Sequence, residues 1–171
     1  LLSGGLWSRR FLGNHGVELL TLTVAASVAR TAPMQGPTDI AVGAPDFSFR
    51  KRHDGGYTIT QRGALDTPLM LDHLLIGSHY IPTLRAQWAN IRLSLGKEFL
   101  NDLALGRRWS AQGRSPFERV RTMEPPVNDS LNAEALRNLT KAWPVFKAAV
   151  FEETWAGMID ITPDSLPVIS Q

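Results

Sequence analysis

The segment DFSFRKRHDGGYTITQR, residues 46–62, restricts the fold of this chain more than any other segment. Phe47 and Phe49 alternate with polar residues, and after an HDGG sequence Tyr57 and Ile59 alternate with threonines. Alternation with a period of two is typical of strands, and a glycine-containing loop between two such runs is typical of a hairpin. The segment therefore predicts an antiparallel hairpin with one polar face.

A short helix is predicted near the start of the chain. Trp7, Phe11 and Leu12 recur at helical spacing, directly after a pair of glycines. A glycine that follows a helical run often ends the helix, so Gly13 or Gly16 is expected to end this one. The pattern indicates a helix that is entered directly from the end of a strand.

The next segments predict a buried strand and then a helical region. Residues 19–30, LLTLTVAASVAR, are rich in Leu, Thr and Val and contain no Pro or Gly, which favours a long, buried strand. Across residues 68–109, apolar residues recur at spacings of three and four, which predicts helices. Pro82 is expected to start a new helix or to kink the existing one. Residues 117–128 contain prolines and are expected to form a linker.

The last third of the chain predicts one more helix and two strands. The helix is expected to begin at Ser130 or Asn132, both good capping residues, and to stop before Pro144. The final segment, FEETWAGMIDITPDSLPVIS, is expected to form two short strands around a Pro-Asp turn. The order of elements is not a regular alternation of strand and helix, so the sequence predicts a mixed α+β fold.

Composition excludes several classes of function. The net charge is only +2, which argues against a nucleic-acid-binding protein. The chain has no cysteine, and its four histidines form neither an i, i+4 pair nor an HExxH motif, so we expect no metal site. No apolar run is long enough to predict a membrane span. One alternative function is a module that binds anions through Arg50, Lys51, Arg52 and the pair Arg107 and Arg108.

Two motifs at opposite ends of the chain carry a resemblance to a known family. They are SGGLWSRRFLGNHGVEL at the start and WAGMIDITPDSLPVIS at the end. In this order and at this separation they resemble the FAD-dependent amine oxidoreductases of the D-amino-acid oxidase superfamily, in particular the D-amino-acid dehydrogenase and glycine oxidase branch. The resemblance implies a largely antiparallel sheet with flanking helices, which is the substrate domain, together with edges of the FAD-binding domain.

The resemblance also implies a division of the chain into three parts. Residues 1–18 would be the end of the FAD-binding domain, residues 19–153 the substrate-binding domain, and residues 154–171 the strand that returns toward the FAD-binding domain. The GxGxxG fingerprint that holds the pyrophosphate in this family does not occur in the sequence. We therefore expect an internal fragment or one piece of a split enzyme, which would be inactive alone and would need the missing FAD-binding segments or a partner subunit.

The resemblance assigns the first motif to the cofactor. Ser3, Gly4, Gly5 and Trp7 match positions that lie against FAD in the family. Glycine has a physical reason to stand there, because a backbone without Cβ can approach a dinucleotide closely and turn sharply into a helix. The alternative is an ordinary tight turn with Trp7 in the core.

The second motif is expected to contact the substrate. Trp155 and Gly157 match the Trp-x-Gly of the family, and Trp155 would line the substrate pocket or pack in the core. Oxidases of the family often carry an arginine for the substrate carboxylate at the position of Ile159. That departure argues against an ordinary α-amino-acid substrate, and Asp160 could instead bind a substrate cation or end the strand.

Two residues of the hairpin are further candidates for the substrate pocket. Tyr57 and Arg62 lie on or after its second strand, and either could contact a substrate carboxylate. The histidines, His53, His73 and His79 among them, are expected to be surface or hydrogen-bonded polar residues rather than catalytic groups.

The resemblance implies a reaction and a set of partners. FAD would accept a hydride from the Cα of an amine or amino acid, and the resulting imine would be hydrolysed by water, so no nucleophile or other catalytic side chain is expected. The alternative is a non-catalytic interaction or oligomerisation domain of the same fold, and a homo-oligomer is compatible with both. The expected location is the cytoplasm, with attachment to the cytoplasmic face of a membrane as a second option.

Overall fold

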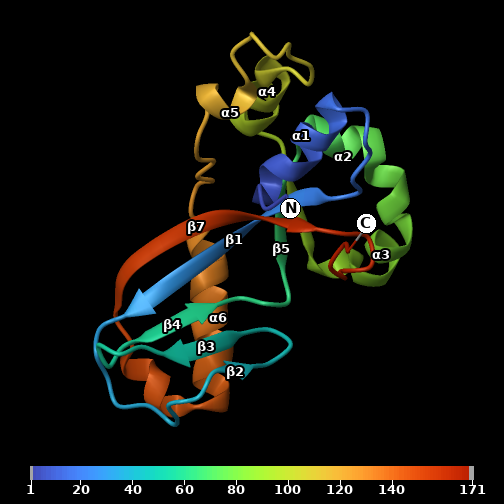
Figure 1. Ribbon diagram of the computed structural model, residues 1–171. Coiled ribbons are helices and arrows are strands. Elements are labelled where there is room, and N and C mark those ends of the chain that lie inside the picture. Colours follow the sequence, from blue (N-terminus) through green and yellow to red (C-terminus); the bar gives the residue numbers. More distant parts are fainter. Residues whose placement is uncertain (1, 170–171) are drawn as a thin grey trace. The chain divides into compact units, whose positions relative to one another are not determined.

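The computed structural model of the protein describes residues 2–169 (Figure 1). Its internal contacts divide the chain into two compact units, and each unit is assembled from separate segments. Unit 1 contains Leu1–Ala25, Asp66–Met123 and Met158–Gln171, and unit 2 contains Ala26–Leu65 and Glu124–Gly157. The two units are defined by contacts within the chain. They do not test the predicted division at residues 18 and 153 into FAD-binding and substrate-binding parts, which stays a prediction.

Among the described residues, seven strands belong to one sheet, in the order β2-β3-β4-β1-β5-β6, with β7 paired to β1. The strands are β1 (Leu22–Thr31), β2 (Val42–Gly43), β3 (Ser48–Lys51), β4 (Tyr57–Thr60), β5 (Leu65–Pro68), β6 (Ile91–Ser94) and β7 (Phe151–Ile161). The pairings of β1 with β4 and β5, and of β3 with β2 and β4, are antiparallel. The two long strands, β1 and β7, contribute residues to both units.

Along the chain, the helices lie before and between these strands. They are α1 (Ser8–Asn14), α2 (Leu71–Ile76), α3 (Ile81–Gln87), α4 (Lys97–Leu105), α5 (Pro116–Arg119) and α6 (Asp129–Ala142). Short 3-10 turns occur at Gly5–Trp7, Gly77–Tyr80, Trp88–Asn90 and Pro144–Ala148. No helix within residues 2–169 has both the length and the apolar character needed to cross a membrane.

The core of unit 2 lies between the hairpin and α6. The apolar face of β3 and β4 packs on α6 and on the turn that follows it, as the ribbon also shows (Figure 1). The buried members of this cluster are Phe47, Phe49, Tyr57, Ile59, Ala135, Leu139 and Phe146. The apolar face of the hairpin, which repeats every two residues, therefore packs against the apolar face of α6, which repeats every 3.6 residues. Each face is buried by the other.

The hairpin turn requires glycine. Gly55 has a φ of +86°, which residues with a side chain adopt only with strain. A Cβ on Gly56 would lie 2.4 Å from the carbonyl oxygen of Thr31. The amide of Arg52 donates to the carbonyl of Gly56 over 2.8 Å and closes the turn.

The α+β fold class is confirmed, and so are the hairpin, the long first strand and the first helix. Pro82 stands in the first turn of α3. Of the two expectations for this residue, that it starts a new helix is therefore the correct one. Five expectations about elements were wrong. The helical region contains the strand β6, the final described segment forms the single strand β7 rather than two strands, and α6 is capped by Asn128 rather than by Ser130 or Asn132. Within the described residues, the first helix is entered from the 3-10 turn Gly5–Trp7 and not from a strand, and the expected linker begins inside α5.

Candidate functional site

The N-terminal segment presents its backbone to the surface before α1 begins. Ser3, Gly4 and Gly5 are all exposed, and the amide of Trp7 donates to the carbonyl of Gly4 over 3.1 Å. Gly5 has a φ of +53°, in the left-handed region that favours glycine. A Cβ built on Gly5 would meet no atom within 4 Å, so open space lies in front of this backbone.

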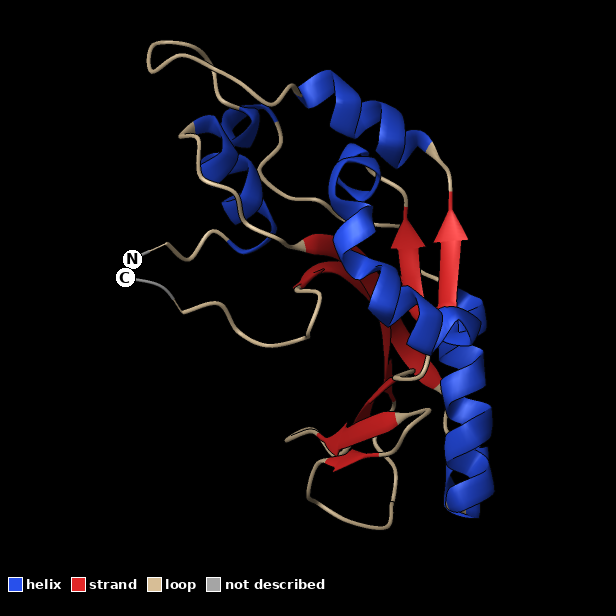
Figure 2. Ribbon diagram, turned by 90° about the vertical axis from the view of Figure 1, so that its right-hand side faces the viewer, coloured by secondary structure: helices blue, strands red, loops and turns tan. Residues whose placement is uncertain are grey.

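A cavity of about 1010 Å³ lies in unit 1 between this segment and the end of β7. Figures 1 and 2 both draw the segment that follows β7 beside the N-terminal segment. The cavity is lined by Leu2, Ser3, Gly5, Ser8, Leu12, Val17, Leu19, Thr21, Asp160, Ile161, Thr162 and residues 165–169. The structure therefore brings together three residues that the sequence singled out at opposite ends of the chain, Ser3, Gly5 and Asp160.

Asp160 is the acidic residue of this cavity. Its side chain is partly buried, and the hydroxyl of Thr23 donates to its Oδ1 over 3.3 Å. Burial raises the pKa of Asp160 above its ordinary value; the Thr23 hydroxyl acts in the opposite direction, and the negative charge of Asp72 adds to the increase. A carboxylate in such a place is stabilised by a positively charged ligand.

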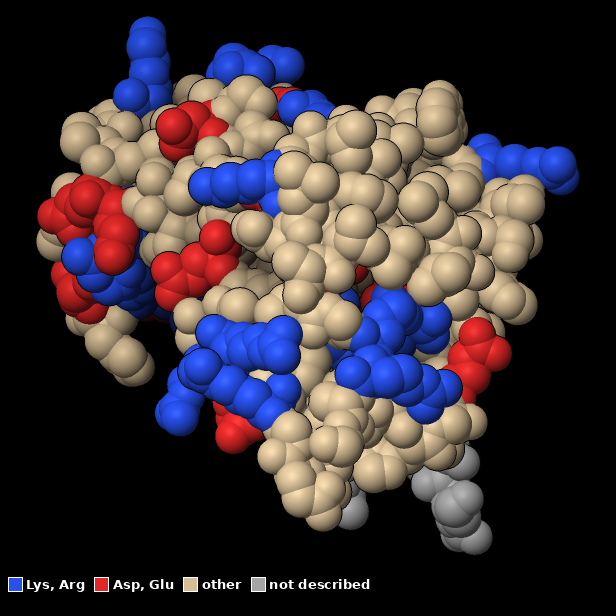
Figure 3. Space-filling model, turned by 90° about the horizontal axis from the view of Figure 1, so that it is seen from above, with Lys and Arg blue, Asp and Glu red and all other residues tan. Residues whose placement is uncertain are grey.

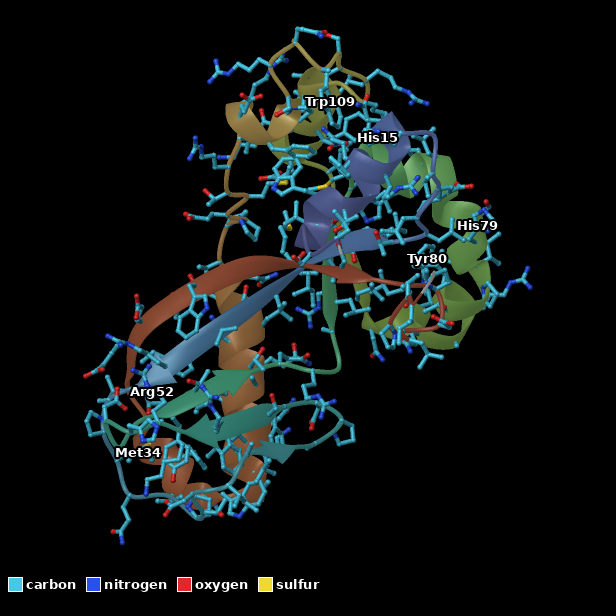
Figure 4. All side chains as sticks on the ribbon, in the orientation of Figure 1. His15, Met34, Arg52, His79, Tyr80 and Trp109 are labelled. Atoms are coloured by element: carbon cyan, nitrogen blue, oxygen red, sulfur yellow. The ribbon has the colours of Figure 1, made fainter. Side chains whose placement is uncertain are left out.

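Tyr80 supports the end of β7, where Asp160 and Ile161 line this cavity, and its side chain is labelled in Figure 4. Its hydroxyl lies 2.6 Å from the carbonyl of Ile161 and 3.1 Å from that of Leu20, and it can donate to either. Burial raises the pKa of Tyr80 to about 12, so the hydroxyl keeps its proton at neutral pH. Thr83 adds a hydrogen bond of 2.6 Å to the carbonyl of Pro163.

Sequence reasoning did not find Tyr80 and Thr83. The spacing of Ile76 and Tyr80 indicates that they share one helical face, but both acceptor carbonyls of Tyr80 lie far away in the chain. Only a contact between distant segments gives this hydroxyl its role.

The other residues predicted to contact the cofactor or the substrate lie elsewhere. Trp7 is half-buried and packs edge-on against Phe117, with ring centroids 5.3 Å apart. Tyr57 is fully buried in the core of unit 2, where its hydroxyl donates to the carbonyl of Thr38 over 3.1 Å. Arg62, also in unit 2, is exposed.

The two remaining candidates are on the part of β7 that belongs to unit 2. Trp155 is 40% exposed, so much of its ring is not packed in the core. A Cβ on Gly157 would meet no atom within 4 Å. Their assignment to a substrate pocket stays a prediction, as do those of Tyr57 and Arg62.

The histidines are distributed without a shared site. His73 is partly buried and its Nδ1 accepts a hydrogen bond of 3.0 Å from the amide of Met70. Burial lowers the pKa of His73, so it is neutral at neutral pH. His53 and His79 are exposed, and residues 2–169 contain no group of three or more His, Cys, Asp or Glu side chains arranged to hold a metal ion.

A family model of FAD-dependent oxidoreductases matches residues 1–171. The chain belongs to this family. No significant match to a curated protein was found.

Solved structures of other proteins are similar to most of this chain. The L-amino acid deaminase from Proteus vulgaris is 28% identical, with a TM-score of 0.86 over 99% of this chain and 39% of its own. That from Proteus myxofaciens, solved in complex with anthranilate, is 29% identical, with a TM-score of 0.88 over 99% of this chain and 38% of its own. The glycine oxidase from Geobacillus kaustophilus is 15% identical with a TM-score of 0.50, over 95% and 30% of the two chains, and shows the fold alone. This chain thus spans about two-fifths of the length of the deaminases.

The N-terminal turn fits the cofactor of the family, which is FAD. The exposed backbone at Ser3 and Gly4, the left-handed Gly5 and the open space in front of it would allow a flat ring or a phosphate chain to approach closely. The adjacent cavity offers mostly apolar walls formed by leucine, valine and isoleucine side chains. These residues can supply one side of a flavin site.

Proposed function

We propose that these residues form the substrate side of an enzyme that oxidises an amino acid or a related amine with FAD. The observation that carries the proposal is the cavity shared by the Ser3–Gly5 turn and Asp160, which come from the two motifs of the sequence. The names of the similar deaminases support an amino-acid substrate. The anthranilate in one of them, which has an amino and a carboxylate group, supports the same class of ligand.

Three tasks fall to residues of this chain. The backbone from Ser3 to Gly5 would hold the flavin, with Gly5 leaving room for close approach. Asp160 would bind the ammonium group of the incoming substrate, since a half-buried carboxylate gains most from a positive partner. The apolar walls of the cavity would exclude water from the reacting carbon.

The chemistry that FAD would supply here when bound is oxidation of the substrate by uptake of a hydride from its Cα. Loss of that hydride and of a proton from nitrogen leaves an imine, and the addition of water then releases ammonia and a carbonyl product. Asp160 can accept the proton that the ammonium group must lose before its nitrogen lone pair becomes available. No side chain needs to form a covalent bond to the substrate.

The position of Ile159 bears on how the substrate carboxylate is held. An isoleucine cannot form the two-pronged hydrogen bond that an arginine makes to a carboxylate. A donor other than residue 159 is therefore needed for the substrate carboxylate, and the prediction for Arg62 stays a prediction from the sequence alone. Tyr57 is left out of the proposed site because its side chain is fully buried.

The proposal is tested with the longest natural polypeptide that carries these residues, purified with its flavin. Anaerobic mixing with L-amino acids, D-amino acids and simple amines should bleach the flavin absorbance for one of these classes. No reduction by any of them would contradict the proposal. The comparison of the two enantiomers also decides between the predicted D-amino-acid dehydrogenase branch and an L-specific enzyme.

Asp160→Asn provides the residue-level test. We expect kcat/KM for the substrate to fall by about tenfold or more, because the neutral amide loses the charge interaction with the ammonium group. Glu152→Gln is the matched control, since Glu152 is an exposed carboxylate on the same strand, and its kcat/KM should not change. Equal activity of the Asp160→Asn variant and the unmodified protein would remove Asp160 from the site.

A further inference from the structure

A second cavity of unit 1, about 260 Å³ in volume, is lined by an unusual number of arginines. Its lining residues are Arg9, Arg10, Gly13, Gly16, Val17, Glu18, Arg107 and Arg108. Figure 4 labels His15, which lies within the first of the two segments that line this cavity, and Trp109, which directly follows the second. The amide of Trp109 donates to the side chain of Asn14 over 3.0 Å. The cavity shares only Val17 with the lining of the proposed flavin site.

Two of the arginines are fixed by one carboxylate. Arg9 Nε lies 2.8 Å from Asp72 Oδ1, and Arg107 Nη2 bonds to the same oxygen. Burial alone would raise the pKa of Asp72, but the hydrogen bonds and charges of Arg107 and Arg9 outweigh this and lower it. Asp72 is therefore ionised at neutral pH and holds both guanidinium groups in place.

A second carboxylate fixes the third arginine. Arg10 forms an ion pair with Asp102, and both side chains are almost fully buried, at 6% and 4% exposure. Arg10 also donates to the carbonyl of Gly106 over 3.2 Å, and Asp102 accepts from the amide of Leu71 over 3.1 Å. Arg10 is thus preorganised by its partners before any ligand binds.

The positive charge of this cavity is only partly balanced. Arg108 donates to a neutral acceptor, the carbonyl of Asn14, over 3.0 Å. Asp72 and Asp102 neutralise two of the four arginines, and the carboxylate of Glu18 is the third negative charge beside the cavity. Basic side chains gather on the face seen in Figure 3, with acidic side chains among them.

Arg107 has an unmet hydrogen-bond requirement. Its Nη1 is buried and has no hydrogen-bond partner among the described residues. A buried donor without an acceptor loses its hydrogen bonds to water without replacing them, which destabilises the structure. A small rotation of the guanidinium group toward the cavity would allow an anion there to supply the missing acceptor.

We propose that this cavity is a binding site for a phosphate-type oxyanion. Guanidinium groups match the oxygen geometry of phosphate, and a tetrahedral anion can accept from arginines that converge from several directions. The volume is several times the roughly 30 Å³ that one water molecule occupies in the liquid, which suffices for an oxyanion and its first waters. The shared chemistry is the oxyanion, whether it is inorganic phosphate or the phosphoryl group of a small metabolite.

The test uses the longest natural polypeptide that carries these residues and measures binding of inorganic phosphate by calorimetry at constant ionic strength. Arg108→Gln should weaken phosphate binding by about tenfold, because it removes a charged donor at an exposed position. Glu18→Gln should tighten phosphate binding, because it removes a negative charge from the cavity. Arg50→Gln, at an exposed arginine of the hairpin in unit 2, is the matched control and should change nothing.

Additional ligands distinguish the source of the oxyanion. Sulfate and glycerol 3-phosphate are titrated under the same conditions, and tighter binding of the monoester than of inorganic phosphate would assign the site to a phosphorylated metabolite. Similar binding of both would assign it to the free anion. The proposal is overturned if none of these ligands binds, or if binding is insensitive to both Arg108→Gln and Glu18→Gln. These measurements need no turnover, so they are independent of the proposed oxidation.

Discussion

Gly5 shows at the scale of one residue how backbone conformation and site are linked. Its φ of +53° is open to glycine without strain, and its exposed backbone faces the cavity assigned to the flavin. A side chain at this position would have space but an unfavourable backbone conformation.

Gly5→Ala is therefore expected to destabilise the protein by about 1 kcal/mol through backbone strain, and to lower its flavin content. Urea unfolding and flavin absorbance of the purified protein measure the two effects. Gly13→Ala is the matched control, because Gly13 lies inside α1, has no left-handed backbone and has no atom within 4 Å of a built Cβ. It should leave flavin content unchanged and stabilise the helix slightly.

Asp160 gives a pH-dependent prediction. Because its folded pKa is raised above the ordinary value of 3.8, the folded protein holds this proton more tightly than the unfolded chain. The free energy of unfolding should therefore fall as the pH rises from below 3.8 through the raised pKa. Asp160→Asn removes this decrease, so the variant should gain stability relative to the unmodified protein as the pH rises. Parallel urea titrations across this range measure it, and a constant difference would contradict the raised pKa.

At the scale of elements, unit 1 is connected by charge as well as by apolar contact. Asp72 in α2 bonds to Arg9 of α1 and to Arg107, which follows α4. Asp102 in α4 bonds to Arg10 of α1. The helix α1, which follows the Ser3–Gly5 turn, is thereby joined to two elements that are far from it in the chain.

Asp72→Asn should destabilise the protein by about 1 to 3 kcal/mol at neutral pH, because two charged hydrogen bonds are weakened. The folded pKa of Asp72 is lowered, so this stabilisation is present above the ordinary value of 3.8 and is lost as the pH falls below it. The difference between variant and unmodified protein should shrink over that range. Asp39→Asn is the control: Asp39 pairs with Lys51 but its side chain is 82% exposed, so the change should be below about 1 kcal/mol.

At the scale of the whole molecule, the chain matches its family over all 171 residues but only 38 to 39% of the length of the similar deaminases. Its residues supply one side of the proposed flavin site, and its sequence contains no GxGxxG fingerprint. The alternative prediction, a non-catalytic interaction or oligomerisation domain of the same fold, stays a prediction that self-association measurements can test.

We expect the 171 residues expressed alone to fold but to bind FAD at least about tenfold more weakly than the longest natural polypeptide that carries them. Circular dichroism would verify the fold, and quenching of flavin fluorescence would measure affinity for both proteins. Sedimentation of the chain at several concentrations would show whether it associates with itself. Flavin that stays bound to the isolated chain in equal amount through purification would contradict the prediction.

Local sequence patterns predicted an element correctly where one face of that element is apolar and buried and the other is polar. Phe47, Phe49 and Tyr57 predicted the hairpin because their alternation matches its buried face. The strand β6 was missed because four residues do not distinguish a strand from a helical turn by period alone. The cap of α6 was missed because Asn128, Ser130 and Asn132 are all capping types, and only the bond from the Leu131 amide to Asn128 selects one.

The sequence by itself determined the fold class, the hairpin and the family, because these depend on periodicity and on motifs that are contiguous in the chain. It also predicted Ser3, Gly5 and Asp160 as site residues, but from two motifs that lie far apart. Only the tertiary structure decided that these three residues line one cavity, that Tyr80 supports the end of β7, and that Arg10 pairs with Asp102. Each of those contacts joins segments that are distant in the chain, and a local pattern carries no information about which distant segments meet.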